Sequence, residues 1–195
     1  MNHIVIRKAE KHHARQIATL VMEAMNHDCC QWFAGPEHTL DDFHQLMTRL
    51  VERDDSQYSY RNTLVAATDA AADDIVGILV SYDGARLHQL RRAFIDEALH
   101  AFGIDYSGMD DETQAGELYL DSLCVRSDFR HMGIATALLQ AGIERGRSEV
   151  LPAVGLLVDQ GNPKAEHLYR SLGFSYAGDS NWGGHPMRHL VYMLK

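Results

Sequence analysis

Apolar and polar positions recur along the chain with two different periods. Apolar residues lie three and four apart from Ile17 to Ala24, which predicts a helix over residues 11–25. The same spacing predicts a second amphipathic helix over residues 40–51, with Thr39 as its N-cap. Shorter apolar runs between turn residues predict strands. The expected strands are residues 3–7, 62–68, 75–82, 117–125, 153–158, 174–176 and 187–194.

The remaining segments complete one alternating pattern. We expect helices over residues 87–102, after Gly133 and over residues 163–172, where Pro163 suits a first turn and Gly173 suits a helix end. A break is expected at residues 26–36, a turn at 69–74 and an acidic loop at 103–116. No internal repeat, linker or low-complexity tract divides the sequence. The sequence therefore predicts a single mixed α/β domain over residues 1–195.

Composition and charge narrow the class of protein. Apolar residues make up 46% of the 195 residues, enough for a substantial core, and no segment approaches the roughly 18 apolar residues of a membrane span. The N-terminal segment lacks the apolar core of a signal peptide. The net charge of -9 argues against nucleic-acid binding and suits a cationic substrate. Three cysteines, two of them adjacent, form no disulfide framework, so we expect a cytoplasmic protein.

The stretch from Glu117 to Gln140 carries the first chemical signal. It consists of an apolar strand, a turn with the sequence RHMGIA starting at Arg130, and a helix that opens on small residues. A helix start has unpaired N–H groups and the positive end of the helix dipole, which together bind phosphate. The turn lacks the Walker A and dinucleotide-binding patterns. Taken alone, it fits an ordinary strand-to-helix turn equally well.

A second motif lies about 30 residues downstream, where Asn162 to Phe174 read NPKAEHLYRSLGF. With the V-x-x-x-x-R-x-x-G-x-A pattern of Val125 to Ala135, it resembles the signatures of the GNAT superfamily of acyl-CoA-dependent N-acyltransferases. The resemblance implies an α/β (α+β) fold: a curved, mixed, mostly antiparallel sheet with helices on both faces. Its central parallel strands, here residues 117–125 and 153–158, are expected to splay apart and hold acetyl-CoA between them.

The resemblance also implies roles for individual residues. The strand backbone at 123–125 would pair with the pantetheine arm, and the N–H groups of the turn would hold the pyrophosphate. Asn162 would contact the arm, and Tyr169 would lie near the thioester sulfur. The implied acetyl-CoA-binding residues are Leu123, Cys124, Val125, Arg130, His131, Met132, Gly133, Ile134, Ala135, Thr136, Asn162, Ala165 and Tyr169. No metal is expected.

The implied reaction needs a base, an oxyanion donor and an acid. Deprotonating an alkylammonium of pKa near 10.4 at pH 7 costs roughly 4.6 kcal/mol. Strand alternation places Glu117 and Asp121 on one face, so both are candidates for the base, unless one is solvated and the other fixes a bulge. Tyr82 or Asp83, acting through water, are further options. The backbone N–H near Val125 suits the oxyanion, and Tyr169 suits the leaving thiolate or belongs to the core.

Three further segments are candidates for shaping the acceptor site. His27 to Cys30 contain metal-ligand residue types, but we favour a cover over the acceptor pocket because adjacent cysteines point apart. Residues 182–185 read as a loop that walls the same site. The connection over residues 83–116 is longer than a normal strand-to-strand turn and reads as an insertion that shapes the pocket. Cys124 reads as an inert buried thiol.

These observations predict an N-acetyltransferase that acts on a primary amine of a small molecule or peptide by direct attack. The alternative is a non-catalytic acyl-CoA-binding or sensor protein on the same fold. Nucleic acid and membranes are not expected partners, and members of the resembled family often form homodimers.

Overall fold

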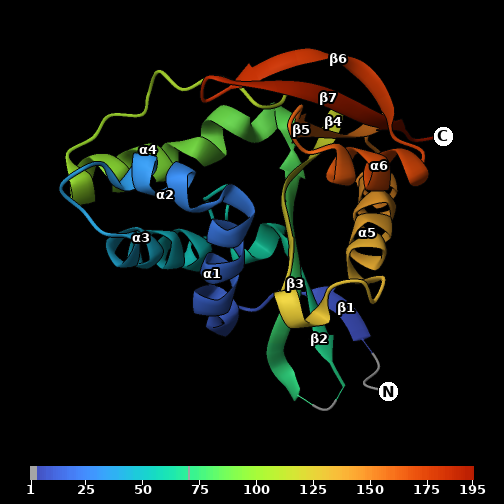
Figure 1. Cartoon of the computed structure of the whole chain (residues 1–195), viewed down its shortest axis with the longest axis horizontal. Coiled ribbons are helices and arrows are strands. Elements are labelled where there is room, and N and C mark those ends of the chain that lie inside the picture. The colour runs from blue at the N-terminus through green and yellow to red at the C-terminus, as the bar shows by residue number, and fades with distance from the viewer. Residues whose placement is uncertain (1–3, 70) are drawn as a thin grey trace.

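The computed structural model describes residues 4–69 and 71–195, and within them the strands form one seven-stranded sheet in the order β1-β2-β3-β4-β5-β7-β6 (Figure 1). Apolar and β-branched residues dominate its central strands. The strands are β1 (Ile4–Lys8), β2 (Thr63–Thr68), β3 (Ala71–Asp83), β4 (Glu117–Val125), β5 (Ala153–Asp159), β6 (Ser175–Trp182) and β7 (His185–Met193).

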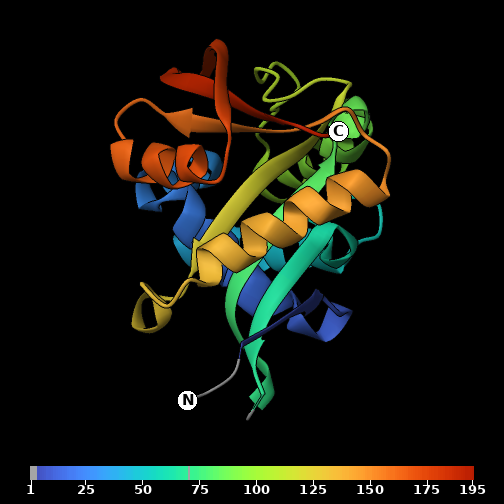
Figure 2. The ribbon, with the colours of Figure 1, turned by 90° about the vertical axis from the view of Figure 1, so that its right-hand side faces the viewer.

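The pair β4 and β5 is the one parallel pair in the described sheet, and it is short. Register contacts join Glu117 to Ala153, Leu118 to Val154 and Tyr119 to Gly155, after which the two strands diverge. Figure 2 shows β4 and β5 running in different directions beyond this point. The predicted splay of the central strands is therefore present.

Helices cover both faces of the sheet (Figures 1 and 2). One face carries α1 (Ala14–Met25), α2 (His27–Ala34), α3 (Leu40–Glu52) and α4 (Leu87–Phe102), and the other carries α5 (Ile134–Ser148) and α6 (Pro163–Ser171). Each side has its own apolar core, one around Phe33, Phe43 and Phe94 and one around Leu138 and Leu190. Short 3₁₀ turns lie at Lys11–His13, Tyr60–Asn62, Gly84–Arg86 and Ser127–Phe129.

Most predicted elements are present, and the amphipathic helices match best. Thr39 caps α3 as expected: its hydroxyl accepts from the Asp42 N–H, and the Asp42 carboxylate accepts from the Thr39 N–H. The fold class, a mixed sheet with parallel β4 and β5, is confirmed. No helix in residues 4–69 and 71–195 is long and apolar enough to cross a membrane.

Three predicted boundaries were wrong. Residues 26–36 contain the helix α2, which Asn26 starts at a φ of 69° with its side chain accepting from the Cys29 N–H, and which Gly35 ends at a φ of 75°. The turn at 69–74 is shorter, because β3 begins at Ala71. The final strands are longer than expected, since β6 and β7 pair far beyond the apolar residues. His3, at the start of the expected first strand, lies outside the described residues.

Candidate active site

The turn between β4 and α5 folds back on the end of its own strand. The Arg130 Nε donates a hydrogen bond to the Val125 carbonyl oxygen at 3.1 Å. His131 and Gly133 have left-handed backbone angles, with φ of 63° and 78°, and Gly133 is the N-cap of α5. Because L residues with side chains are strained in this conformation, the turn has a conformational reason for its glycine.

The N–H groups of this turn are unused. From His131 to Thr136, none donates a hydrogen bond to another residue in the described part of the chain. The first turn of α5 also lacks an acidic side chain that would compete for them. Free N–H groups at a helix start favour an anion, and the predicted phosphate-binding segment has this property.

The edge of β4 next to this turn is open. Residues 120–125 pair with β3 on one side, and in the described chain no strand pairs with their other side. The side chains of Leu123 and Val125 pack into the core under α5. The Cys124 thiol lies 3.6 Å from the Glu23 carboxylate, and burial raises its pKa to about 12. These three residues therefore offer backbone groups, and Cys124 is a neutral thiol.

The second motif forms α6. The Asn162 carboxamide oxygen accepts from the Ala165 N–H at 3.2 Å, so Asn162 caps the helix, and its amide nitrogen makes no hydrogen bond in the described chain. Burial raises the pKa of Tyr169 to about 12, which makes it a neutral O–H donor. Its ring lies edge-on to Phe174, and it is close enough to Tyr119 of β4 to affect the pKa of Tyr119.

Glu117 is buried where β4 and β5 are still paired. Its carboxylate accepts from the Thr113 hydroxyl at 2.6 Å and lies 2.8 Å from His189 Nε2 of β7. Gly155 of β5 makes room for it, because a Cβ at position 155 would overlap the carboxylate. Both Glu117 oxygens are therefore engaged by neighbouring donors.

Asp121 lies at a bulge, as expected from the sequence. Val80 of β3 pairs with Ser122 and Ser81 pairs with Leu120, which leaves Asp121 unpaired between them. One carboxylate oxygen accepts from the Ser122 hydroxyl at 2.7 Å, and the other accepts from Gln57 and from the Tyr82 hydroxyl, each at 3.3 Å. Loss of solvation raises the pKa of Asp121 despite these bonds. Asp121 is thus a stronger base than an exposed aspartate.

Glu112 shares these donors and was not singled out by the sequence. It accepts from the Tyr82 hydroxyl at 3.0 Å and from Gln57 at 3.3 Å, and it forms an ion pair with the buried Arg91. Local sequence gave no signal beyond an acidic run, because the contacts join residues 20 or more positions apart. His189, the partner of Glu117, was missed for the same reason.

Comparison with known sequences identifies the family. The sequence model described as the acetyltransferase (GNAT) family matches residues 22–174, which is more than half of the chain. The chain belongs to the GNAT acetyltransferase family. The resemblance seen in the two motifs is therefore confirmed.

Curated GNAT relatives match shorter stretches. The mycothiol acetyltransferase of Propionibacterium freudenreichii subsp. shermanii is 37% identical over 82 residues, which is 41% of this chain and 26% of that protein. The L-methionine sulfoximine/L-methionine sulfone acetyltransferase of Pseudomonas aeruginosa is 40% identical over 57 residues, 29% of this chain and 33% of that protein. The chain thus spans between a quarter and a third of these curated relatives.

Solved GNAT structures match over nearly the whole chain. A crystal structure described as an acetyltransferase has a TM-score of 0.80 and 27% identity, and the match covers 98% of this chain and 100% of the other. The N-acetyltransferase from Staphylococcus aureus Mu50 has a TM-score of 0.79 and 22% identity, with 96% and 100% covered. The second likeness supports the fold alone.

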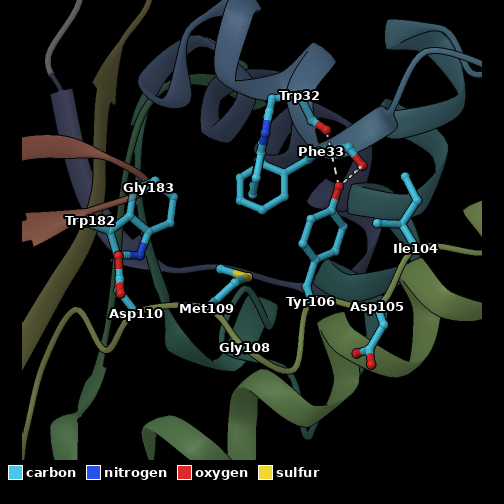
Figure 3. A pocket seen from close by; sticks show the side chains of 10 residues that line it. All are labelled: Trp32, Phe33, Ile104, Asp105, Tyr106, Gly108, Met109, Asp110, Trp182 and Gly183. Atoms are coloured by element: carbon cyan, nitrogen blue, oxygen red, sulfur yellow. Dashed lines mark hydrogen bonds between the residues drawn. The ribbon is translucent and has the colours of Figure 1, made fainter.

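The three segments expected to shape the acceptor site of this GNAT protein do lie together. Helix α2, the loop after α4 and the turn between β6 and β7 meet around a pocket of about 510 Å³ (Figure 3). Each segment contributes an aromatic side chain to the wall of the pocket: Trp32 from α2, Tyr106 from the loop and Trp182 from the end of β6. Of the expected cover residues, His27, Asp28 and Cys29 line a neighbouring hollow and not this pocket, and the sequence did not predict the aromatic character of its wall.

The cysteines of α2 are not available as metal ligands in their neutral form. Burial raises the pKa of Cys29 to about 11 and that of Cys30 to about 12, while metals bind the thiolate. A different group, formed by His12, His13 and Asp73, has ligand atoms within 4.8 Å of one another. However, the Glu10 N–H lies 2.9 Å from His13 Nδ1 and the Arg7 guanidinium lies 3.1 Å from His13 Nε2, so a donor already faces each nitrogen of this ring.

Proposed function

We propose that this GNAT protein transfers an acetyl group from acetyl-CoA to the primary amine of a small molecule or peptide by direct attack. The observation that carries the proposal is the open edge of β4 followed at once by the unused N–H groups of residues 131–136. The first feature suits the amides of a pantetheine arm and the second suits a pyrophosphate. Acetyl-CoA is accordingly the proposed cosubstrate.

The individual binding roles follow the same order along the chain. The backbone of Leu123, Cys124 and Val125 would pair with the arm, with side chains serving only to hold the strand in place. The turn from Arg130 to Thr136 would bind the pyrophosphate, and Arg130 would brace it through its bond to the Val125 carbonyl. The free amide nitrogen of Asn162 would donate to the arm, and Ala165 would line its path.

Asp121 is the proposed base. It lies where β4 leaves β5, and burial makes its carboxylate a better proton acceptor than an exposed aspartate. The Tyr82 hydroxyl, which contacts both Asp121 and Glu112, would relay a proton through water. Asp121 would take one proton from the ammonium group, and the neutral nitrogen would bond to the acetyl carbonyl carbon. The carbon–sulfur bond then breaks, Tyr169 protonates the leaving thiolate of coenzyme A, and the second proton lost by the nitrogen returns to Tyr169.

Glu117 has a supporting role in this proposal. Its carboxylate is buried and engaged by Thr113 and His189, so it is less available to an incoming ammonium group. Pairing with Glu117 would fix the orientation of His189. The backbone N–H near Val125 would stabilise the developing oxyanion.

Tyr169 is proposed to protonate the leaving thiolate. A half-buried tyrosine whose pKa is raised to about 12 is neutral at pH 7 and carries a proton to donate. Replacing Tyr169 with Phe should lower kcat by about a hundredfold and leave the affinity for acetyl-CoA nearly unchanged, because the ring still packs on Phe174. An equal loss of turnover and affinity would instead make Tyr169 a binding residue.

A thiol-release assay tests the whole proposal. Purified protein is incubated with acetyl-CoA and a panel of primary amines, and free coenzyme A is measured. Turnover with at least one amine supports the enzyme. Binding of acetyl-CoA without turnover of any acceptor favours the sensor, and absence of binding overturns both functions.

The proposal also covers the domain organisation, the oligomeric state and the cellular location. We propose that residues 1–195 act as one domain in which residues 83–116 are an insertion. A homodimer is a prediction that light scattering can check. The free cysteines suit a reducing compartment, so the cytoplasm remains the proposed location.

A further inference from the structure

The pocket between α2, the loop after α4 and the β6–β7 turn has aromatic walls. Trp32 is exposed over 58% of its surface, which is unusual for so large an apolar side chain. It lines this pocket and also a neighbouring hollow of about 430 Å³ that shares Trp182 and Gly183. Figure 3 shows the rings of Trp32, Phe33, Tyr106 and Trp182 facing the same space.

These rings are held in fixed positions. The Tyr106 hydroxyl donates to the carbonyl oxygens of Trp32 and Phe33, at 3.1 and 3.0 Å, and so ties the loop to the end of α2. Phe33 lies edge-on to both Trp32 and Tyr106, with ring centroids 4.9 and 5.2 Å apart. A rigid arrangement of ring faces and edges favours a flat aromatic guest at little entropic cost.

A buried arginine positions the part of the pocket wall that the loop after α4 supplies. Arg91 of α4 donates to the carbonyl oxygens of Met109 and Asp110, at 3.3 and 2.8 Å, and its side chain is only 4% exposed. Because the same guanidinium pairs with Glu112, it fixes together the part of this loop that walls the pocket and the part that reaches Tyr82. The pocket is therefore formed in advance of binding.

Charge restricts the guest further. Asp105 and Asp110 line the pocket, and Asp28 lines the neighbouring hollow; all three are exposed acids. They attract a cationic amine and repel a free carboxylate.

The pocket is connected to the proposed base through packed rings. Phe94 contacts Phe33 and Tyr106 at one end and Tyr58 at the other, at centroid distances of 5.2, 5.7 and 6.4 Å. Asp121 and Cys29 are both near enough to Tyr58 to contribute to its raised pKa, and Cys29 lines the neighbouring hollow. The neighbouring hollow also reaches the end of β5, since His185 in its wall lies 3.8 Å from the Asp159 carboxylate, so a guest that spans both spaces would have its amine toward the splayed strands.

We infer that the acceptor is a primary amine on a flat aromatic body without a free carboxylate, bound between Trp32, Tyr106 and Trp182. The inference rests on the proposed function and names the class of substrate for that site. The aromatic body would lie in the walled pocket while its side-chain amine reaches the splayed strands.

A panel of matched amines tests this class. Initial rates at saturating acetyl-CoA are compared for 2-phenylethylamine, tyramine, 2-cyclohexylethylamine, phenylalanine and spermidine. We expect kcat/KM for the two aromatic amines to exceed that for the cyclohexyl amine by about tenfold, since only the flat ring stacks on the walls. Phenylalanine should be poorer than 2-phenylethylamine because of its carboxylate. Faster turnover of spermidine or of the cyclohexyl amine overturns the inference but leaves the acetyltransferase standing.

Two variants make the test specific to the pocket. Trp32→Ala should raise KM for the aromatic amines about tenfold and leave KM for acetyl-CoA unchanged, and its exposure makes misfolding a small concern. Tyr176→Ala is the control, because Tyr176 is an aromatic of β6 with 49% exposure that does not line the pocket. Equal effects of the two substitutions, or no effect of Trp32→Ala, would refute the pocket as the acceptor site. No turnover of any amine by the unmodified protein would instead refute the proposed function.

Discussion

At the scale of single residues, Asp121 combines a functional position with a cost in stability. Its pKa is raised because its carboxylate is removed from water, which means that the folded protein binds this proton more tightly than the unfolded chain does. The stabilisation from this group is therefore fully present below the pKa that Asp121 has in the unfolded chain. It is lost as the pH rises through the pKa that Asp121 has in the folded protein. At neutral pH the ionised carboxylate destabilises the fold.

Replacing Asp121 with Asn should raise Tm at pH 7, by about 2–4 °C, while it lowers kcat. The amide oxygen can still accept from Tyr82, and the amide nitrogen can donate to the Ser122 hydroxyl. The gain in Tm should shrink as the pH falls through the folded pKa of Asp121 and vanish below the unfolded pKa of about 3.9, where the carboxyl is protonated in both states. Thermal unfolding over a pH series provides the measurement, and a gain in Tm that does not depend on pH would contradict the raised pKa.

Gly155 shows how one missing side chain fixes another residue. A Cβ at this position would overlap the Glu117 carboxylate, so Gly155→Ala should displace Glu117 from His189 and lower the free energy of unfolding by about 1–3 kcal/mol. Gly178→Ala is the matched control, because a Cβ in that strand position meets nothing within 4 Å. Denaturant unfolding of both variants measures the difference. Equal stabilities would mean that Glu117 moves aside at no cost.

The sequence could propose single candidate residues where their geometry depends on one strand or one turn. Glu117 and Asp121 became candidates because strand alternation places them on one face, and the expected bulge at Asp121 is present. His189, Gln57 and Glu112 were missed because their partners are distant in the sequence. Such pairs depend on strand order, which no local pattern specifies.

At the scale of elements, the turn before α5 lets the conformational role of a glycine be tested separately from its proposed role in ligand binding. Gly133 and Gly103 both have left-handed φ angles, of 78° and 69°, and a Cβ at either position meets nothing within 4 Å. Each substitution by Ala should therefore cost a similar free energy of unfolding, about 1 kcal/mol. Only Gly133 lies among the unused N–H groups.

We accordingly expect Gly133→Ala to weaken acetyl-CoA binding several-fold, while Gly103→Ala changes stability alone. Isothermal titration calorimetry with coenzyme A, together with denaturant unfolding, separates the two effects. If both variants bind coenzyme A as the unmodified protein does, the turn is not the pyrophosphate site.

The one helix that the sequence missed, α2, forms for tertiary reasons. It has only 8 residues, too few for stable helicity on propensity alone. Phe33 packs against Phe43 and Phe94 from two other helices, and Tyr106 bonds to the carbonyl oxygens of Trp32 and Phe33. The longer helices α1 and α3 were predictable because their own apolar stripes carry the signal.

At the scale of the whole molecule, the acidic surface acts differently on the two proposed substrates. The net charge of -9 attracts a cationic amine and repels the polyphosphate of acetyl-CoA. Raising NaCl from about 20 to 300 mM screens both effects, as the Debye length falls below about 10 Å. We expect kcat/KM to fall for the amine and to rise for acetyl-CoA. A neutral acceptor analogue is the control, and changes of the same sign for both substrates would contradict the expectation.

The short pairing of β4 with β5 leaves the middle of the sheet with an open backbone edge when no ligand is bound. Such an edge is a template on which another chain can add a strand, and this addition is a common first step of aggregation. A pantetheine arm on the same groups would block that step. The cellular level of acetyl-CoA would then govern how long this protein survives heat, in addition to how fast it works.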